Sequence, residues 1–416
     1  MLDFWNFTAD SFMVDRPRLA VVTPRFPFPL NKGDRLRIHH QLKVLHGHFH
    51  IDLHCLTFRR IPPSELEQLQ DRCDSITLYR LNPIKATFRM AWALFSRRPF
   101  QVLLFTERRH CRKMRVNILA QHPDVLLAQM VRTAEYVKDF DAVPHVLDIM
   151  DTLHAGAVRE AERAPWWKRP LLIEEGRRLL RYEHRVHHYF DGCTIISRQD
   201  RDLLPHPDRD EVHIVPNGVD TDHFHPACDP PPLSLPGLPV DVAFCGNMGY
   251  APNVVAARFL VEEIAPAFER LERRPLRILI CGAQPTATVL GLASPSVTVV
   301  RDVPDIRSAY LSAPLFVAPM LVNTGLQNKL LEALSLERAC ITTPRALSAI
   351  DVDLNGAIQS AESPEEFAER IAALLKAPDM AAGMGRIGRH QVQSHFGWTA
   401  ASANLVTLLQ TFTRTR

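Results

Sequence analysis

Short apolar segments alternate with helix-like stretches along both halves of the 416-residue chain, and this alternation limits the folds open to it. The pattern is typical of parallel β-sheets covered by helices. We therefore predict two doubly wound α/β domains in tandem. The expected strands are Arg18 to Thr23, Ile51 to Thr57, Val125 to Gln129, His145 to Asp148, Gly192 to Ile196, Val240 to Gly246, Arg277 to Gly282, Val297 to Val300, Leu315 to Pro319 and Cys340 to Thr343.

Proline marks the predicted boundary between the domains. The chain has 32 Pro against 17 Gly, and Pro recurs through residues 226–239. Such a stretch cannot continue a helix or a central strand, so it is interpreted as a semi-rigid linker. We expect an amino-terminal domain over residues 1–225, a second domain over 240–395 and a terminal helix over 396–416.

The composition excludes several protein classes. With 46% hydrophobic and 23% charged residues, the chain is neither disordered nor fibrous. No apolar run approaches 18 residues and the start lacks the features of a signal peptide, so the protein is expected to be soluble or peripheral. A net charge of +3 does not by itself indicate nucleic-acid binding. The eight Cys form no C-x-x-C pair and are interpreted as buried free thiols.

Positive charge is nevertheless concentrated in one segment. Residues 85–115 contain nine Lys or Arg and a single acid, Glu107. Phe88, Trp92 and Phe95 follow one another at helical spacing between these charges, which fits an interfacial helix attracted to an anionic membrane. A core-facing helix with a solvated basic face is the alternative. The pair Trp166 and Trp167 would extend the same surface.

Two turns that precede helices are candidate ligand sites. One is the turn that begins at Gly325, after the strand expected at Leu315, and leads into a helix that contains Lys329 and Glu332. Ligands of open α/β sheets bind at such carboxyl ends of strands. Lys329 and Glu332 share a helix face there, where a cation can hold a diphosphate and a carboxylate can accept hydrogen bonds from a ribose diol. A surface ion pair is the alternative. The other turn leads into a helix predicted over Gly33 to Leu45, whose amino-terminal amides favour anions.

Two further groups of polar residues are weaker candidates. His46, His48 and His50 could bind a metal from one face of a strand, but a solvated turn is the favoured interpretation. Asp148, Asp151 and His154 follow a strand end where an acceptor hydroxyl could be oriented. A capping role for Asp148 is equally consistent with its position.

Eight short segments occur in a fixed order along the chain. They are Pro27-Phe-Pro-Leu-Asn-Lys-Gly33-Asp-Arg35, Leu147-Asp-Ile-Met-Asp151, Arg181-Tyr-Glu183, Pro216-Asn-Gly-Val-Asp220, Phe244-Cys-Gly-Asn-Met-Gly249, Ile278-Leu-Ile-Cys-Gly282, Val300-Arg-Asp-Val-Pro-Asp305 and Gly325-Leu-Gln-Asn-Lys-Leu-Leu-Glu332. The order of those in the second half resembles the carboxyl-terminal domain of glycosyltransferase family 4. More narrowly, the chain resembles bacterial sugar transferases linked to exopolysaccharide biosynthesis.

The resemblance implies a GT-B architecture, in which two Rossmann-like domains face a cleft and a terminal helix crosses back. It implies a hexosyltransferase of class EC 2.4 that retains anomeric configuration. The second domain would hold a nucleotide-sugar donor, and the first a glycan or lipid-linked acceptor. Neither a cofactor nor a catalytic metal is implied. The protein would act in the cytoplasm, peripherally on the inner face of the membrane through residues 85–115.

The resemblance also assigns roles to single residues. It implies that Lys329 and Asp151 are catalytic, with Lys329 on the donor diphosphate, and that Glu332 binds the donor ribose. Gly33 matches a loop that closes over the donor phosphates, and Val303 lies beside the base. The remaining residues expected at the donor are Gly246, Asn247, Thr324, Gly325, Leu326, Gln327 and Asn328.

Three positions depart from the family pattern. Thr324 stands where the first Glu of the E-x7-E motif is expected, so the amides of Gly325 and Leu326 would bind the sugar hydroxyls instead. Asn247 replaces the usual Arg, and Met150 replaces the His that precedes Asp151. These departures keep two alternatives open: a GT-B-type epimerase or phosphorylase, and a non-catalytic binder of sugar nucleotides.

Overall fold

The computed structural model describes residues 16–413 except Asn31, Leu94, residues 234–238, residues 323–325 and Asp351, and it also leaves the side chain of Arg163 undescribed. The predicted site residues Thr324 and Gly325, together with part of the predicted linker, therefore lie outside the described residues.

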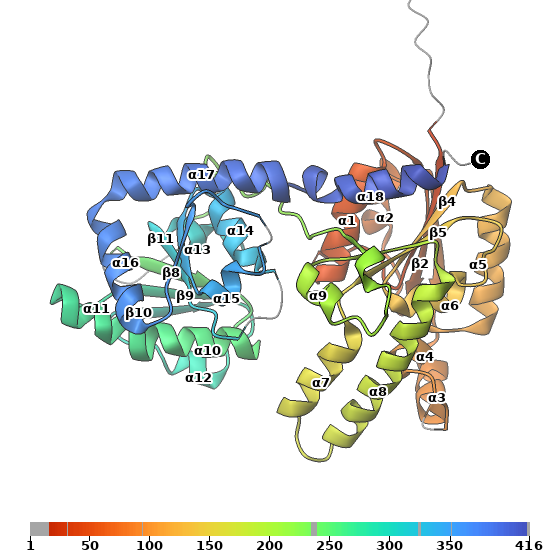
Figure 1. Cartoon of the computed structure of the whole chain (residues 1–416), viewed down its shortest axis with the longest axis horizontal. Coiled ribbons are helices and arrows are strands. Elements are labelled where there is room, and N and C mark those ends of the chain that lie inside the picture. The colour runs from red at the N-terminus through yellow and green to blue at the C-terminus, as the bar shows by residue number, and fades with distance from the viewer. Residues whose placement is uncertain are drawn as a thin grey trace, which may run out of the picture. The chain divides into compact units, whose positions relative to one another are not determined.

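The described chain forms two parallel sheets (Figure 1). The seven-stranded sheet has the order β3-β2-β1-β4-β5-β6-β7, and the six-stranded sheet has the order β10-β9-β8-β11-β12-β13. The strands are β1 (Arg18–Thr23), β2 (His50–Thr57), β3 (Ser75–Arg80), β4 (Val125–Gln129), β5 (His145–Met150), β6 (Gly192–Ile195), β7 (His213–Ile214), β8 (Val242–Cys245), β9 (Ile278–Gly282), β10 (Val297–Arg301), β11 (Leu315–Ala318), β12 (Ala339–Thr342) and β13 (Ile358–Ser360). The predicted α/β class with two doubly wound sheets is confirmed.

In each sheet the strand order reverses at one position. The reversal lies between β1 and β4 in the first sheet and between β8 and β11 in the second. Helices that follow strands on the two sides of such a reversal cover opposite faces of the sheet, which leaves a crevice at the carboxyl ends of the two central strands. This crevice is where each sheet can admit a ligand.

Helices fill the connections of the first sheet and cover its central strands, which are fully buried. The helix α7 packs along α8 as a hairpin, and α3 packs against α4. The helical elements up to β7 are α1 (Gly33–Leu45), α2 (Pro63–Gln70), α3 (Pro83–Ala93), α4 (Phe100–Phe105), α5 (Arg108–Gln121), η1 (Val131–Thr133), α6 (Ala134–Val137), α7 (Leu153–Arg163), α8 (Arg169–Val186), η2 (His187–Tyr189), α9 (Arg198–Asp202) and η3 (Arg209–Glu211).

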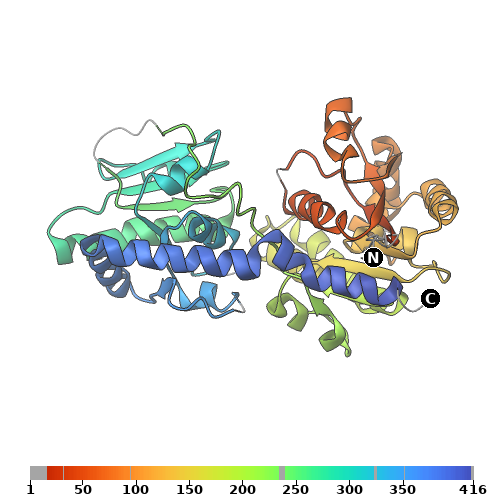
Figure 2. The same ribbon diagram turned by 90° about the horizontal axis from the view of Figure 1, so that it is seen from above.

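The second sheet lies between two layers of helices. The helix α17 packs on α14 and β12, while α16 packs on α11, and Figure 2 shows α17 running the length of this unit. The helical elements are α10 (Ala251–Phe259), the π-helix η4 (Leu260–Ile264), α11 (Ala265–Glu272), α12 (Ala287–Leu290), α13 (Arg307–Leu311), α14 (Asn328–Ser335), α15 (Pro344–Leu347), α16 (Pro364–Lys376), α17 (Pro378–Phe396) and α18 (Trp398–Thr413).

The chain divides into two compact units. The first unit holds residues 1–193 together with 406–416, and the second holds residues 194–405. The division falls inside β6 and again inside α18, so each of these elements contributes residues to both units. The boundaries predicted from the proline content, at residues 225 and 240, stay predictions.

The sequence and the structure agree less well at the sheet edges. The strands β3, β7 and β13 were not expected; β3 is mostly half-buried, and β7 and β13 contain only two and three residues.

Three other features can be compared with the sequence-based expectations. His46 and His48 lie in a turn after α1, and only His50 enters a strand. The eight Cys are free thiols. No helix within the described ranges is long and apolar enough to cross a membrane.

Candidate functional site

Lys329 lies at the crevice of the second sheet. It belongs to the first turn of α14, which follows β11, and its ammonium group donates a hydrogen bond to the side-chain oxygen of Asn253 on α10. The same nitrogen lies 5.0 Å from the ring centroid of Phe244 and 3.8 Å from the sulfur of Met320. Burial among these groups lowers the pKa of Lys329 to about 8.

Glycine residues make room for this cation. A Cβ on Gly246, at the end of β8, would lie 3.2 Å from Nζ of Lys329 and 2.9 Å from Nδ2 of Asn253. A Cβ on Gly282 would lie 1.6 Å from the carbonyl oxygen of Gly246, so only glycine fits there. The two strand ends can approach closely because both positions lack side chains.

Asn253 holds this part of the site together. Its side chain is buried and donates a 2.8 Å hydrogen bond to the carbonyl oxygen of Asn247, while its oxygen accepts from Lys329. Asn247 itself is exposed, and its side-chain oxygen accepts from the amide of Gly249 at 2.9 Å. No motif in the sequence indicated that Asn253 would position the lysine.

Glu332 lies one turn along α14 from Lys329. Its carboxylate accepts a 2.7 Å hydrogen bond from the hydroxyl of the buried Tyr310 on α13. Burial raises the pKa of Glu332, and the Tyr310 hydrogen bond and the positive charge of Lys329 act against that shift. The two site residues therefore have different partners, and neither depends on a direct ion pair with the other.

The other predicted donor residues of the second sheet lie in two places, before α14 and after β10. Gln327 is buried directly before α14, Asn328 is half-buried at its first position, and Leu326 is half-buried just upstream. Val303 is half-buried against the core between β10 and α13. Leu326, Gln327 and Asn328 thus lie next to Lys329 in the segment that follows β11, whereas Val303 follows β10 at the edge of the sheet.

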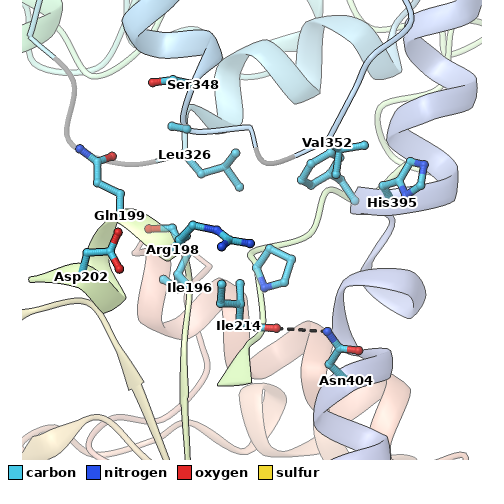
Figure 3. A pocket seen from close by; sticks show the side chains of 14 residues that line it. Ile196, Arg198, Gln199, Asp202, Ile214, Leu326, Ser348, Val352, His395 and Asn404 are labelled. Atoms are coloured by element: carbon cyan, nitrogen blue, oxygen red, sulfur yellow. Dashed lines mark hydrogen bonds between the residues drawn. The ribbon is translucent and has the colours of Figure 1, made fainter. Parts of the chain in front are cut away.

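A cavity of about 640 Å³ adjoins Leu326 (Figure 3). Its lining residues all belong to the second compact unit and include Arg198, Asp202, Ser348 and His395. Among the predicted donor residues that the structure describes, Leu326 is the one that lines it. Because Lys329 and Glu332 are not part of its wall, we do not assign it to the donor diphosphate.

The first sheet has its own cluster at the reversal between β1 and β4. Gly33 is exposed at the start of α1 with open space around its Cα, and Asp34 next to it pairs with Arg25. The guanidinium carbons of Arg25 and Arg132 lie 5.7 and 5.6 Å from the ring centroid of Phe105. Burial, assisted by the charge of Arg25, lowers the pKa of Arg132. No motif in the sequence indicates a role for these two arginines.

The carboxylates of Asp148, within β5, and Asp151, just after it, have different environments. Asp148 is fully buried and receives two hydrogen bonds from Arg37, at 2.8 and 3.1 Å, so it is part of a buried ion pair between β5 and α1. Asp151 is exposed one residue after Met150, whose φ of 69° is rare for a side chain of this size. The geometry favours a structural role for Asp148 and leaves Asp151 accessible.

His154 is oriented by a buried carboxylate. Its Nδ1 lies 2.6 Å from Oε2 of Glu183 on α8, and Oε1 of Glu183 accepts the backbone amide of Leu153. Glu183 therefore caps the start of α7 and holds the imidazole near Asp151. Among the described residues, no group of three His, Cys, Asp or Glu is arranged to hold a metal ion.

Comparison with known proteins gives a family for part of the chain. Residues 239–377 match the family model Glycosyl transferases group 1. A comparison with curated protein sequences gives no significant match.

Solved structures match almost the whole chain. A glycosyltransferase from Rickettsia africae has a TM-score of 0.63 at 13% identity, covering 96% of this chain and 100% of the other. A sucrose-phosphate synthase from Thermosynechococcus elongatus gives the same values. HepE from Anabaena, solved in complex with UDP, has a TM-score of 0.61 at 11% identity and covers 95% of this chain and 100% of its own.

The fold is that of the GT-B glycosyltransferases. The predicted architecture is confirmed at this level. The group 1 segment begins just before β8 and ends just before α17, so it contains Gly246, Lys329 and Glu332. The roles predicted for these residues stay predictions.

Proposed function

We propose that this protein is a retaining glycosyltransferase that moves a sugar from a nucleotide-sugar donor to a lipid-linked acceptor. The observation that carries the proposal is the half-buried cation of Lys329 at the strand reversal of a group 1 glycosyltransferase domain. A diphosphate placed there would meet a fixed positive charge in surroundings from which water is partly excluded. Glu332 would then bind the ribose.

The proposed reaction places the acceptor on the same face of the sugar as the leaving group. The bond between the anomeric carbon and the diphosphate oxygen breaks, and the acceptor oxygen forms the new bond. The acceptor proton passes to the departing phosphate oxygen. Negative charge grows on the diphosphate during this step, so Lys329 would lower the barrier by electrostatic stabilisation.

The first nucleotide to test is uridine. The HepE structures contain UDP, UDP with glucose, or UDP-glucose, and we extend this ligand class to the present chain as a proposal. In the first unit, Arg25 and Arg132 would supply positive charge for a phosphate-bearing acceptor, and Asp151 would orient its hydroxyl. We place the activity in the synthesis of exopolysaccharide or another cell-surface glycan, without a metal or cofactor.

Direct titration and a transfer assay test the proposal. Purified protein is titrated with UDP-glucose and other nucleotide sugars, and sugar transfer is then followed with and without a lipid-diphosphate acceptor. Lys329→Ala should lose most donor turnover, whereas Lys376→Ala, at an exposed position on α16, should match the wild type. Undiminished turnover by Lys329→Ala would refute the assignment. Donor conversion without any acceptor would favour an epimerase, and donor binding without turnover a non-catalytic binder.

A further inference from the structure

The outer face of α3 is made of large apolar side chains that no described part of the first unit covers. Ile84, Phe88 and Trp92 are 67%, 72% and 65% exposed, and Phe95, just beyond the helix, is 87% exposed. Their spacing of three or four residues places them along one stripe. We define these four side chains as the α3 stripe. Isolated exposed apolar residues are common, but a continuous stripe of this size is a mark of an interaction surface.

The opposite face of α3 is already occupied. Ala86 and Ala93 are buried, and Ala93 packs with Phe100 and Leu103 while Met90 covers the same cluster. The helix therefore cannot turn its aromatic stripe inward without giving up this packing. The exposure of the stripe follows from how α3 and α4 pack.

A second apolar element extends toward the same side of the first unit. The turn between α7 and α8 carries Trp166 and Trp167, which are 84% and 61% exposed, and Figure 1 shows this turn and α3 both at the lower edge of the unit. The two elements are joined through α8. Arg178 donates to the carbonyl oxygen of Ala93 at 2.6 Å, and Glu175 accepts from the amides of Phe100 and Gln101.

The charges around these aromatics are basic. Between Asn82 and Arg98 the chain has four Lys or Arg and no acid, and Lys85, Arg97 and Arg98 are exposed. Arg98 is 3.5 Å from Glu135 and remains about half exposed. At the other element, Nζ of Lys168 lies 4.9 Å from the ring centroid of Trp167. Residues 159–169 have four basic and two acidic side chains, the acids being Glu160 and Glu162.

We propose that the first unit docks on an anionic lipid bilayer through the α3 stripe and the Trp166–Trp167 turn. Trp and Phe side chains bind at the level of the lipid head groups, while Lys and Arg beside them are attracted to anionic head groups. A protein partner would not require this combination of aromatic tips with exposed basic side chains on two separate elements. The proposal deepens the proposed function, because a bilayer-bound enzyme meets a lipid-linked acceptor where that acceptor resides.

Vesicle flotation with the full chain tests the surface. The wild type should float with vesicles of phosphatidylcholine containing 30% phosphatidylglycerol and bind pure phosphatidylcholine at least tenfold more weakly. Phe88→Ser combined with Trp92→Ser, and separately Trp166→Ser combined with Trp167→Ser, should each reduce binding at least tenfold. Val116→Ser is the matched control because Val116 is a 66% exposed apolar residue on α5, a helix that belongs to neither element.

Two further measurements keep the outcome decisive. Brominated lipids should quench tryptophan fluorescence in the wild type. They should not quench it in the triple variant that combines Trp92→Phe, Trp166→Phe and Trp167→Phe. Sedimentation should show that the stripe variants leave the oligomeric state unchanged. Absence of binding to anionic vesicles would overturn the proposal, as would a dimer that disappears when the stripe is changed, because a second copy would then cover it.

The test separates this proposal from the proposed function. The surface variants should bind UDP-glucose as the wild type does, since Lys329 belongs to the other unit. Vesicle binding without any nucleotide-sugar binding would refute the donor assignment and leave the docking surface standing. Donor binding without vesicle binding would refute the docking surface and leave the donor assignment standing.

Discussion

At the scale of single residues, Lys329 is the group whose chemistry most depends on its surroundings. Its pKa of about 8 means that the free protein loses the positive charge at the donor site as the pH rises through 8. Donor affinity should therefore fall about tenfold between pH 7 and pH 9, since about one tenth of the lysine remains protonated at pH 9. Titration calorimetry across this range measures it.

The variant Lys329→Met keeps the length of the side chain without the charge. It should bind donor weakly at every pH. Any change of its donor affinity with pH would come from titration of the nucleotide and can be subtracted from the wild-type dependence. Lys376→Ala should keep the wild-type pH dependence. A wild-type affinity that stays constant from pH 7 to pH 9 would contradict the role of Lys329.

His54 is a second residue whose burial has a measurable consequence. It is fully buried on β2 between Tyr79 and Gln121, and burial lowers its pKa to about 4. Between pH 6.5 and pH 4 the unfolded chain binds a proton at this site and the folded chain does not, so stability falls as the pH falls. The loss should approach about 3 kcal/mol below pH 4.

Urea unfolding at a series of pH values tests this expectation. His54→Gln should show a flatter dependence on pH over that interval, while His213→Gln, at an exposed position, should follow the wild type. If His54→Gln and the wild type lose stability in parallel, the residue is not responsible for the acid sensitivity.

At the scale of secondary-structure elements, Arg37 and Asp148 link α1 to β5. Both side chains are buried, so Asp148→Asn would leave the guanidinium without its counter-charge. The free energy of unfolding should fall by about 3–5 kcal/mol. Asp151→Asn, at the exposed neighbouring position, should change stability by less than about 0.5 kcal/mol.

The two aspartates should also differ in activity assays. Asp151→Asn is expected to change acceptor use while donor binding stays intact, whereas any residual folded Asp148→Asn should use acceptors as the wild type does. The outcome is read from unfolding curves and from transfer rates with and without acceptor. A large stability loss in Asp151→Asn would contradict the separation.

The segment Pro216-Asn-Gly-Val-Asp220 has a structural explanation at this scale. A Cβ on Gly218 would lie 2.6 Å from the Trp398 ring, and the amide of Val219 donates to the carbonyl oxygen of Phe396 at 2.7 Å. Gly218→Ala should therefore displace the junction of α17 and α18 and cost about 1–3 kcal/mol. Gly156→Ala is the control, because its Cβ would meet nothing within 4 Å and alanine favours the helix. Equal thermal stability of the two variants would contradict this account.

At the scale of the whole molecule, donor binding should raise the stability of the folded chain. A ligand at a hundred times its Kd adds about 2.7 kcal/mol, so a thermal-shift panel of UDP-, GDP-, ADP- and CDP-sugars should show one nucleotide class above the others. We expect UDP-sugars to give the largest shift and EDTA to leave it unchanged, since Lys329 supplies the positive charge. A panel without any shift would contradict the donor proposal, and a shift lost with EDTA would require a metal.

Prediction from sequence succeeded where burial produces a simple pattern. The strand β4 is buried throughout and β1 is buried apart from Arg18, so each contains an apolar run, and their predicted bounds are the observed ones. The helix α1 also has the predicted bounds. At the edges of the sheets β3 is mostly half-buried and β13 is very short, and neither leaves a comparable pattern.

Partners of the site residues could not be predicted in the same way. Asn253 lies 76 positions from Lys329 and Tyr310 lies 22 positions from Glu332, so each contact depends on how separate helices pack. Asp148 and Asp151 lie within and just after the same strand, and they look alike in sequence. Only the position of Arg37 on α1 makes one of them structural.

The sequence by itself determined the α/β class, the tandem sheets and the placement of Lys329 in a helix after a buried strand, because these depend on local patterns of apolar and polar residues. The tertiary structure decided which groups lose contact with water. It lowered the pKa of Lys329, removed Asp148 from solvent and left the aromatic face of α3 exposed. The pattern of α3 allowed either face to be buried, and the packing of Ala93 against Phe100 and Leu103 settled the choice.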